Sequence, residues 1–140
     1  MVSGMPESTT IHIAAAIITD KQNRLLLVRK RGTVYFMQPG GKPEPGEDAQ
    51  SALLRELKEE LELDLSPDIL MPLGELTCPA ANEPGYLLHT CLFQIKGQVG
   101  TVRPAAEIEE VRWLSPSEIP STPLAPLTVN EVIPRVWPEV

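Results

Sequence analysis

The sequence predicts an α/β (α+β) domain in which helices and strands form layers around a mixed β-sheet. Several apolar segments have the length and composition of strands, and one central segment has helical periodicity. A second helical segment follows near the C-terminus. Strands before a helix, then further strands and a closing helix, are typical of a layered α/β architecture. The chain has 140 residues, which suits one domain of this kind.

The N-terminal half is expected to contain four elements after a flexible polar tail at 1–9, so that the domain spans 10–140. A nearly continuous apolar run predicts a buried strand, and a turn then leads into the second strand of a hairpin. A short extended segment and a rigid loop rich in proline and glycine follow. These elements lie at 11–20, 24–31, 34–38 and 39–46.

The central helix is predicted to begin after Asp48, whose carboxylate is a good N-cap. Its leucines fall on one stripe of a helical wheel, which is therefore expected to be buried. Glu56, Glu59 and Glu60 share one face, about 100° wide, on a wheel of roughly 100° per residue. That face borders the leucine stripe, so the three carboxylates can line a partly buried groove.

The C-terminal half is expected to contain three strands, a short helical turn after Ser115 and a last helix. Pro72 interrupts the first of these strands, which favours an edge position in the sheet. The last helix is expected to open near Ala125 and Pro126 and to end before Pro134. The three strands and the last helix lie at 69–80, 86–99, 108–115 and 124–136.

Composition excludes several classes of function. The net charge of −7 argues against a nucleic acid polymer as a partner, although a local cation or metal still allows a small phosphorylated ligand. No apolar run approaches the roughly 18 residues of a membrane span, and the N-terminus lacks the pattern of a signal peptide. Cys78 and Cys91 form no metal-binding pattern, so two reduced thiols are expected. A cytoplasmic protein, monomeric or homodimeric, follows from these features.

The glutamates of the central helix allow two interpretations. Glu56 and Glu60 are four residues apart, and like charges at this spacing repel by about 0.2–0.5 kcal/mol. A divalent cation would turn this repulsion into coordination, since Mg²⁺ prefers oxygen ligands. A solvated acidic face, with Arg55 placed to pair with Glu59, explains the same pattern. These residues alone leave both interpretations open.

The loop before the helix extends the pattern into a recognisable motif. Gly41, Glu47, the run Arg55-Glu56-Leu57, the pair Glu59-Glu60 and Leu63 follow one another at fixed spacing over residues 41–63. This stretch resembles the Nudix box, G-x5-E-x7-R-E-U-x-E-E-x-G-U, where U is a bulky aliphatic residue. One specified position departs from the motif, because Glu62 stands where the family has glycine. The helix is therefore expected either to continue through this residue or to bear strain there.

The resemblance implies a fold and an activity. Members of the Nudix family, including MutT-type bacterial enzymes, form an α/β/α sandwich. They hydrolyse a nucleoside diphosphate linked to another group, with Mg²⁺ or Mn²⁺ as cofactor. The resemblance assigns metal binding to Glu56, Glu59 and Glu60, with the backbone carbonyl of Gly40 as a further ligand. It also implies that one of these glutamates, Glu59 or Glu60, orients or deprotonates the attacking water.

Further roles follow from the same resemblance. Glu47 and Arg55 match a pair that braces the loop against the helix, behind Gly41. Arg29 matches a residue that contacts a substrate phosphate, although a solvated cation beside its basic neighbours is an alternative. Some members use an extra glutamate before the last core strand. Glu107 is the candidate for that catalytic base, with Glu110 as the alternative and a purely structural role as a third.

The substrate stays open at this point. A nucleoside triphosphate or a small nucleotide conjugate suits the chain length. Four classes of substrate remain compatible with the sequence. They are damaged purine triphosphates, ordinary deoxynucleoside triphosphates, ADP-ribose and dinucleoside polyphosphates. A catalytically silent nucleotide sensor and a protein-interaction domain with an acidic helix are the competing functions. The loop at 79–86 is a candidate for setting specificity.

Overall fold

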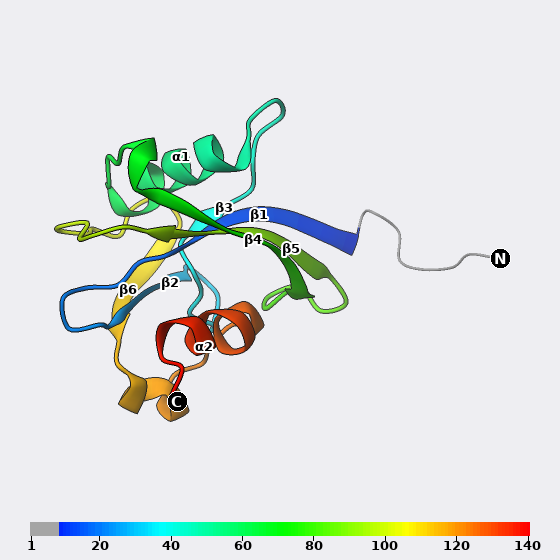
Figure 1. Ribbon diagram of the computed structural model, residues 1–140. Helices are drawn as coiled ribbons and strands as arrows, with labels where there is room; N and C mark the ends of the chain where they lie inside the picture. The colour runs from blue at the N-terminus through cyan, green and yellow to red at the C-terminus, as the bar shows by residue number, and fades with distance from the viewer. Residues whose placement is uncertain (1–8) are drawn as a thin grey trace.

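The computed structural model describes residues 9–140, so the predicted tail at 1–9 lies almost wholly outside the described residues. A four-stranded sheet has the order β3-β1-β5-β4, and a second sheet pairs β2 with β6 (Figure 1). β1 runs parallel to β5 and antiparallel to β3, which makes the larger sheet mixed, as predicted. The strands are Thr10–Ile17 (β1), Leu25–Lys30 (β2), Gly40–Gly41 (β3), Leu70–Pro79 (β4), Leu87–Ile95 (β5) and Ile108–Leu114 (β6).

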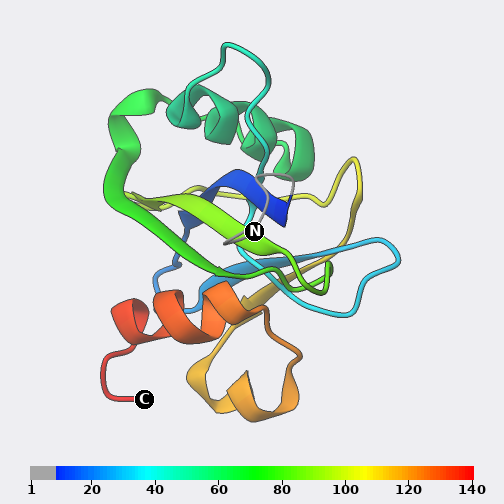
Figure 2. The same cartoon turned by 90° about the vertical axis from the view of Figure 1, so that its right-hand side faces the viewer.

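Helices cover both sides of the larger sheet, which confirms the predicted layers (Figures 1 and 2). The main helix, α1, spans Ala49–Leu61 on one side. On the other side lies a C-terminal helix made of a π-helical part, Thr128–Val132 (η4), and an α-helical part, Ile133–Val136 (α2). Short 3₁₀ turns lie at Pro67–Ile69 (η2) and Pro116–Ser121 (η3). Within residues 9–140, no helix is both long and apolar enough to cross a membrane.

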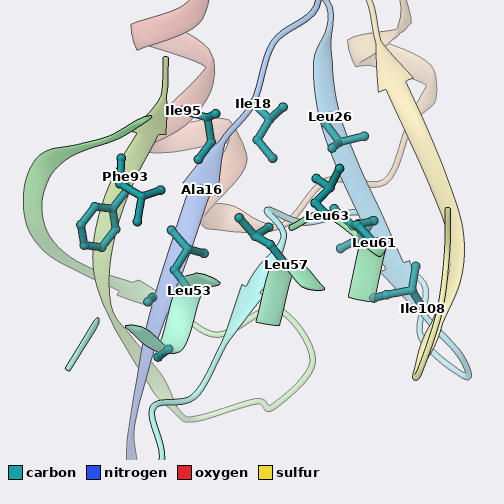
Figure 3. Close-up of a cluster of buried hydrophobic side chains, with 14 residues drawn as sticks. Ala16, Ile18, Leu26, Leu53, Leu57, Leu61, Leu63, Phe93, Ile95 and Ile108 are labelled. Atoms are coloured by element: carbon teal, nitrogen blue, oxygen red, sulfur yellow. The ribbon is translucent and has the colours of Figure 1, made fainter. Parts of the chain in front are cut away.

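Residues 14–17 of β1 and 25–28 of β2 are apolar because both faces of these strands are buried there. Ala14, Ala16 and Ile18 belong to a core cluster under α1, whereas Ala15 and Ile17 belong to a second cluster on the side of the C-terminal helix. This is the alternation that a strand between two layers requires. Figure 3 shows the first cluster, in which leucines of α1 meet side chains from both sheets.

The predicted hairpin is wrong beyond its turn. Thr19 and Leu25 form an isolated bridge, and the Leu26 N–H donates to the Ile18 carbonyl at 2.9 Å. The two strands then separate into different sheets, where β2 pairs with β6. In this position β2 lies between the two core clusters, with Leu26 and Val28 in one and Leu25 and Leu27 in the other.

Interactions between residues close in the sequence determine both ends of α1. Asp48 Oδ1 accepts the Ser51 N–H at 2.7 Å, so Asp48 is the predicted N-cap. At the other end Glu62 has φ +56°, and the helix stops there instead of continuing. The Leu63 N–H donates to the Leu57 carbonyl at 3.3 Å, which closes the helix in the manner usually served by glycine. Glu62 therefore carries the backbone strain that its β-carbon brings to this conformation.

The C-terminal helix does not end before Pro134, contrary to the prediction. The Ile133 N–H donates to the Thr128 carbonyl, five residues back, which makes a π turn. This wider turn directly precedes Pro134, whose ring would otherwise clash with the carbonyl four residues before it. The helix therefore accommodates the proline and continues to Val136. The predicted edge position of β4 is confirmed, and the pairing register shifts at Pro72.

Candidate active site

Three glutamates from two parts of the chain meet beside β3. Glu56 and Glu60 lie on α1, and Glu107 lies in the loop before β6. Each offers a carboxylate oxygen, and these oxygens all lie within 4.8 Å of one another. We call this set the acidic cluster.

The loop that carries Glu107 is attached to the C-terminal end of α1. The Ala105 N–H donates to the Glu60 carbonyl at 2.9 Å, and the Arg103 N–H donates to the Leu61 carbonyl at 3.1 Å. The last carbonyls of a helix have no partner within the helix, so this loop supplies donors that they need. The same contacts bring Glu107 next to the carboxylates of α1.

Glu60 is the most unusual member of the acidic cluster because it is 1% exposed. Its Oε1 accepts the Gly40 N–H at 3.2 Å, while its Oε2 is buried and has no hydrogen-bond partner in residues 9–140. Burial, together with the charges of Glu56 and Glu107, raises the pKa of Glu60 to about 8. Burial also raises the pKa of Glu56. A buried carboxylate oxygen without a donor needs a partner from outside the chain.

The two glycines of β3 allow the strand to approach the cluster closely. A β-carbon on Gly41 would collide with the Glu56 carboxylate. Gly40 has φ +144°, and a β-carbon there would collide with the backbone of Ala14 on β1. Only glycine fits between α1 and β1 at these positions. The Gly-Gly pair thus brings the backbone of Gly40 to Glu60.

Arg55 joins the loop before α1 to the helix. Its Nε and Nη2 each lie 2.9 Å from a different oxygen of Glu47, and Nη2 also donates to the Lys42 carbonyl at 3.0 Å. These bonds from Arg55 hold the pKa of Glu47 down at about 2. A bidentate pair of this kind fixes direction as well as distance. The contacts agree with the bracing role that the motif implies for Glu47 and Arg55, which stays a prediction.

Glu59 lies outside the acidic cluster. Its Oε1 is 3.2 Å from Arg55 Nη1, and its side chain is 53% exposed. Arg55 Nη1 also lies 3.2 Å from Glu56 Oε2, so Glu56 and Glu59 share this guanidinium. The carboxylates whose oxygens lie within 4.8 Å of one another are those of Glu56, Glu60 and Glu107, and the metal-binding role of Glu59 stays a prediction.

Arg29 does not line the cavity beside the acidic cluster, and its contact with a substrate phosphate stays a prediction. Its Nη1 donates to the Thr33 carbonyl at 3.0 Å, and its Nη2 lies 3.3 Å from Glu110 Oε1. Its neighbour Lys30 lines the cavity beside the acidic cluster instead. Glu110 contacts Arg29 and Arg112, so of the two candidate bases only Glu107 lies in the cluster.

A cavity of about 260 Å³ opens beside the acidic cluster, between the two sheets. Gly40 pairs with Ala15, and Ile11 lies four residues earlier on β1, which is about 13 Å along a strand. The cavity therefore extends from an acidic end to an apolar end. The residues that line it outside the cluster include Ile11, Ile13, Lys30, Gln38, Leu88, the loop 79–83 and 125–127.

Sequence reasoning missed most of this lining. Gln38 is 6% exposed, and its amide bonds the Ala16 carbonyl and the Thr128 hydroxyl, each at 2.9 Å. It thereby joins β1 to the π turn of the C-terminal helix. The signal available in the sequence was a glutamine directly before the Pro-Gly-Gly run. The loop at 79–86 does contribute, since residues 79–83 line the cavity.

The residues of the acidic end fit a divalent metal ion. Three carboxylates from α1 and the Glu107 loop offer hard oxygen donors, with the backbone of Gly40 beside them. The unpartnered Oε2 of Glu60 is the oxygen that such an ion would satisfy. An ion would also offset the repulsion among the three carboxylates.

Comparisons with known proteins bear on the family and the fold. The family model described as "NUDIX domain" matches residues 10–136. The CTP pyrophosphohydrolase of Escherichia coli (strain K12) is 32% identical over 126 residues, covering 85% of this chain and 86% of that protein. The 8-oxo-dGTP diphosphatase of Proteus vulgaris is 35% identical over 71 residues, covering 48% of this chain and 63% of that protein. The crystal structure of a MutT protein from Methanosarcina mazei Go1 has a similar fold, with a TM-score of 0.73 at 20% identity, covering 93% of this chain and 94% of that one.

Proposed function

Because this chain belongs to the NUDIX family and is a hydrolase of phosphoric anhydride bonds, we propose that it hydrolyses a nucleoside triphosphate or a small nucleotide conjugate with Mg²⁺ or Mn²⁺. The observation that carries the proposal is Glu60, a buried carboxylate with one unpartnered oxygen inside a cluster of three. CTP and 8-oxo-dGTP are the first substrates to test, since they appear in the names of two relatives.

Glu56, Glu60 and Glu107 would hold the metal, together with the backbone of Gly40. When bound, the metal neutralises negative charge on the substrate's phosphates and makes an attacking water easier to deprotonate. Glu59 stays a predicted ligand. Arg55 bonds both Glu56 and Glu59, so it would have to release whichever of these oxygens binds the metal.

The chain's own residues then supply position and proton transfer. The Gly40 N–H fixes the direction of the Glu60 carboxylate, and the Glu47–Arg55 pair holds the loop that presents Gly40 and Gly41. Glu107 is exposed and borders the cavity, so its carboxylate is the group best placed to accept a proton from water. Hydrolysis of an anhydride needs such positioning and charge more than a covalent nucleophile.

The apolar end suits the nucleoside. Ile11, Ile13 and Leu88 form an aliphatic wall that can take the flat face of a base. The Asn82 side chain, in the loop at 79–86, provides amide groups at the edge of this wall. This division puts phosphates at the carboxylate end and the base at the far end.

The test is release of pyrophosphate and phosphate from a panel of nucleotides, at mildly alkaline pH, with and without Mg²⁺ or Mn²⁺. The panel includes CTP, 8-oxo-dGTP, the ordinary deoxynucleoside triphosphates, ADP-ribose and a dinucleoside polyphosphate. Metal-dependent turnover of one class supports the proposal and identifies the substrate group. Binding of metal and nucleotide without turnover of any of them would favour a nucleotide sensor.

A further inference from the structure

The two cations that end β2 have different surroundings. Side chains alternate along a strand, so Arg29 and Lys30 point to opposite faces. The Arg29 guanidinium bonds Thr33 and Glu110, and its central carbon lies 6.0 Å from the centre of the Phe36 ring. The positive charge and the N–H donors of Arg29 therefore already have partners within the protein.

Lys30 has the opposite surroundings. It is half-buried and lines the cavity together with Glu56, Glu60 and Glu107. No carboxylate of residues 9–140 forms an ion pair with its ammonium, although its charge reaches Glu60 and opposes the rise in the pKa of that residue. Lys42 also lines the cavity, but it is exposed. Lys30 is thus the partly buried cation that faces the acidic end.

The backbone fixes Lys30 in this position. Arg29 pairs with Glu110 on β6, but Lys30 pairs with Ile108, so the register shifts by one residue between them. The extra residue, Glu109, belongs to β6, so β2 keeps its regular alternation and Lys30 faces the cavity on the side opposite Arg29. The Lys30 carbonyl accepts the Thr33 N–H at 3.0 Å and the Thr33 hydroxyl at 2.8 Å, and the Arg31 N–H donates to the Glu107 carbonyl at 2.8 Å.

From this geometry we propose that Lys30, and not Arg29, is the residue of β2 that binds the phosphate groups of the substrate. The inference rests on the proposed function, because it assumes that the acidic end of the cavity receives phosphates. An ammonium is a compact charge with three donors, which suits phosphate oxygens that point in several directions. The metal ion offsets the carboxylates, and Lys30 then adds positive charge from the chain itself.

The test compares wild-type protein with Lys30→Met, Lys30→Arg, Arg29→Met and Lys96→Met. Lys96 is an exposed lysine just beyond β5, outside the cavity, and serves as the matched control for loss of one positive charge. Two quantities are measured for each. One is KM and kcat for the nucleotide that the wild type hydrolyses best. The other is the calorimetric affinity for imidodiphosphate with Mg²⁺, a probe that has phosphate groups but no nucleoside.

We expect Lys30→Met to raise KM and to weaken imidodiphosphate binding by roughly 10- to 100-fold, as for the loss of one charged hydrogen bond. Lys30→Arg should restore most of the affinity, and Lys96→Met should match the wild type. Arg29→Met should lower the melting temperature, because it removes the guanidinium bonds to Thr33 and Glu110, with little change in affinity. If Lys30→Met does not fold, Lys30→Gln replaces it with the same expected result.

Wild-type affinity for imidodiphosphate in the Lys30 variant would overturn the inference. So would a loss confined to Arg29→Met, which would restore the role that the motif implies. Calorimetry measures binding without turnover. The proposal for Lys30 and the proposal of nucleotide hydrolysis can therefore be rejected independently of each other. A protein that hydrolyses none of the panel but binds imidodiphosphate through Lys30 rejects the proposed function and keeps this inference.

Discussion

Glu47 and Glu60 belong to the same short motif, and the fold gives them opposite environments. The Glu47 carboxylate accepts two bonds from Arg55 and one from the Glu44 N–H, and its pKa falls to about 2. The Glu60 carboxylate is buried with one oxygen unpartnered, and its pKa rises to about 8. The comparison teaches that the hydrogen bonds of one carboxylate are satisfied within the chain, whereas the other has an oxygen without a hydrogen-bond partner in residues 9–140.

The largest expected effect comes from Glu60→Gln. This change keeps the shape of the side chain and the oxygen that accepts the Gly40 N–H, but it removes the charge that would bind a metal. We expect kcat to fall at least about 100-fold, as when a group essential to charge stabilisation is lost. Steady-state kinetics, with circular dichroism to verify the fold, measures this. Near wild-type kcat in a folded variant would reject Glu60 as a ligand.

The same change at Glu47 should have a smaller effect. Glu47→Gln removes the charge of the brace but keeps one possible bond to Arg55, so the loop loosens without loss of a metal ligand. We expect kcat/KM to fall roughly 10-fold, a loss of about 1.4 kcal/mol of transition-state stabilisation. The kinetic assay used for Glu60→Gln measures it. A loss as large as that of Glu60→Gln would mean that Glu47 also acts at the metal.

The pH dependence of stability should separate the two glutamates in the metal-free protein. The pKa of Glu60 is raised from 4.5 to about 8 on folding, so the folded state keeps a proton that the unfolded state releases. Stability contributed by this group therefore falls as pH rises between these values, by at most about 1.4 kcal/mol per pH unit. Glu47 has the opposite sign, since its pKa is lowered, and its contribution disappears as pH falls from 4.5 towards about 2.

Urea unfolding in a metal chelator, from pH 5 to pH 8.5, tests the Glu60 part of this prediction. Glu60→Gln should unfold with a flatter pH profile and should be more stable than the wild type at pH 8.5. Parallel profiles for the two proteins would show that Glu60 is not the group that titrates.

The smallest effect is expected at the end of α1. Glu62→Gly should stabilise the protein by up to about 1 kcal/mol, because glycine adopts φ +56° without strain. Glu62→Ala is the control, since it removes the carboxylate but keeps the β-carbon. Thermal unfolding should rank glycine above both, with activity unchanged. If alanine stabilises as much as glycine, charge and not backbone strain limits this end of the helix.

Residues whose partners lie close in the sequence were predictable. Asp48 caps α1 through Ser51, three residues away, and Glu47 meets Arg55, eight residues further along. The spacing of Glu56 and Glu60 placed both beside the leucine stripe, and the structure finds both in the acidic cluster. Local geometry decides these positions, so a short motif suffices.

Positions that depend on distant pairing were not predictable in the same way. Strand alternation places Arg29 and Lys30 on opposite faces of β2, but which face borders the cavity depends on how β2 packs against distant parts of the chain. Glu107 was named from family resemblance, but its place beside Glu60 depends on hydrogen bonds between its loop and the end of α1. The hairpin prediction failed for the same reason, since β2 takes a partner about 80 residues further along the chain.

The most direct test of the central claim is a calorimetric titration of Mn²⁺ into the wild type, Glu60→Gln and Glu47→Gln, without nucleotide. The claim is that the Glu60 carboxylate binds a metal ion, whereas the Glu47 carboxylate stabilises the fold through its bonds to Arg55. It predicts that Glu60→Gln weakens Mn²⁺ binding by at least about 10-fold, while Glu47→Gln stays close to the wild type. Equal affinity in the wild type and Glu60→Gln, or an equal loss in both variants, would contradict it.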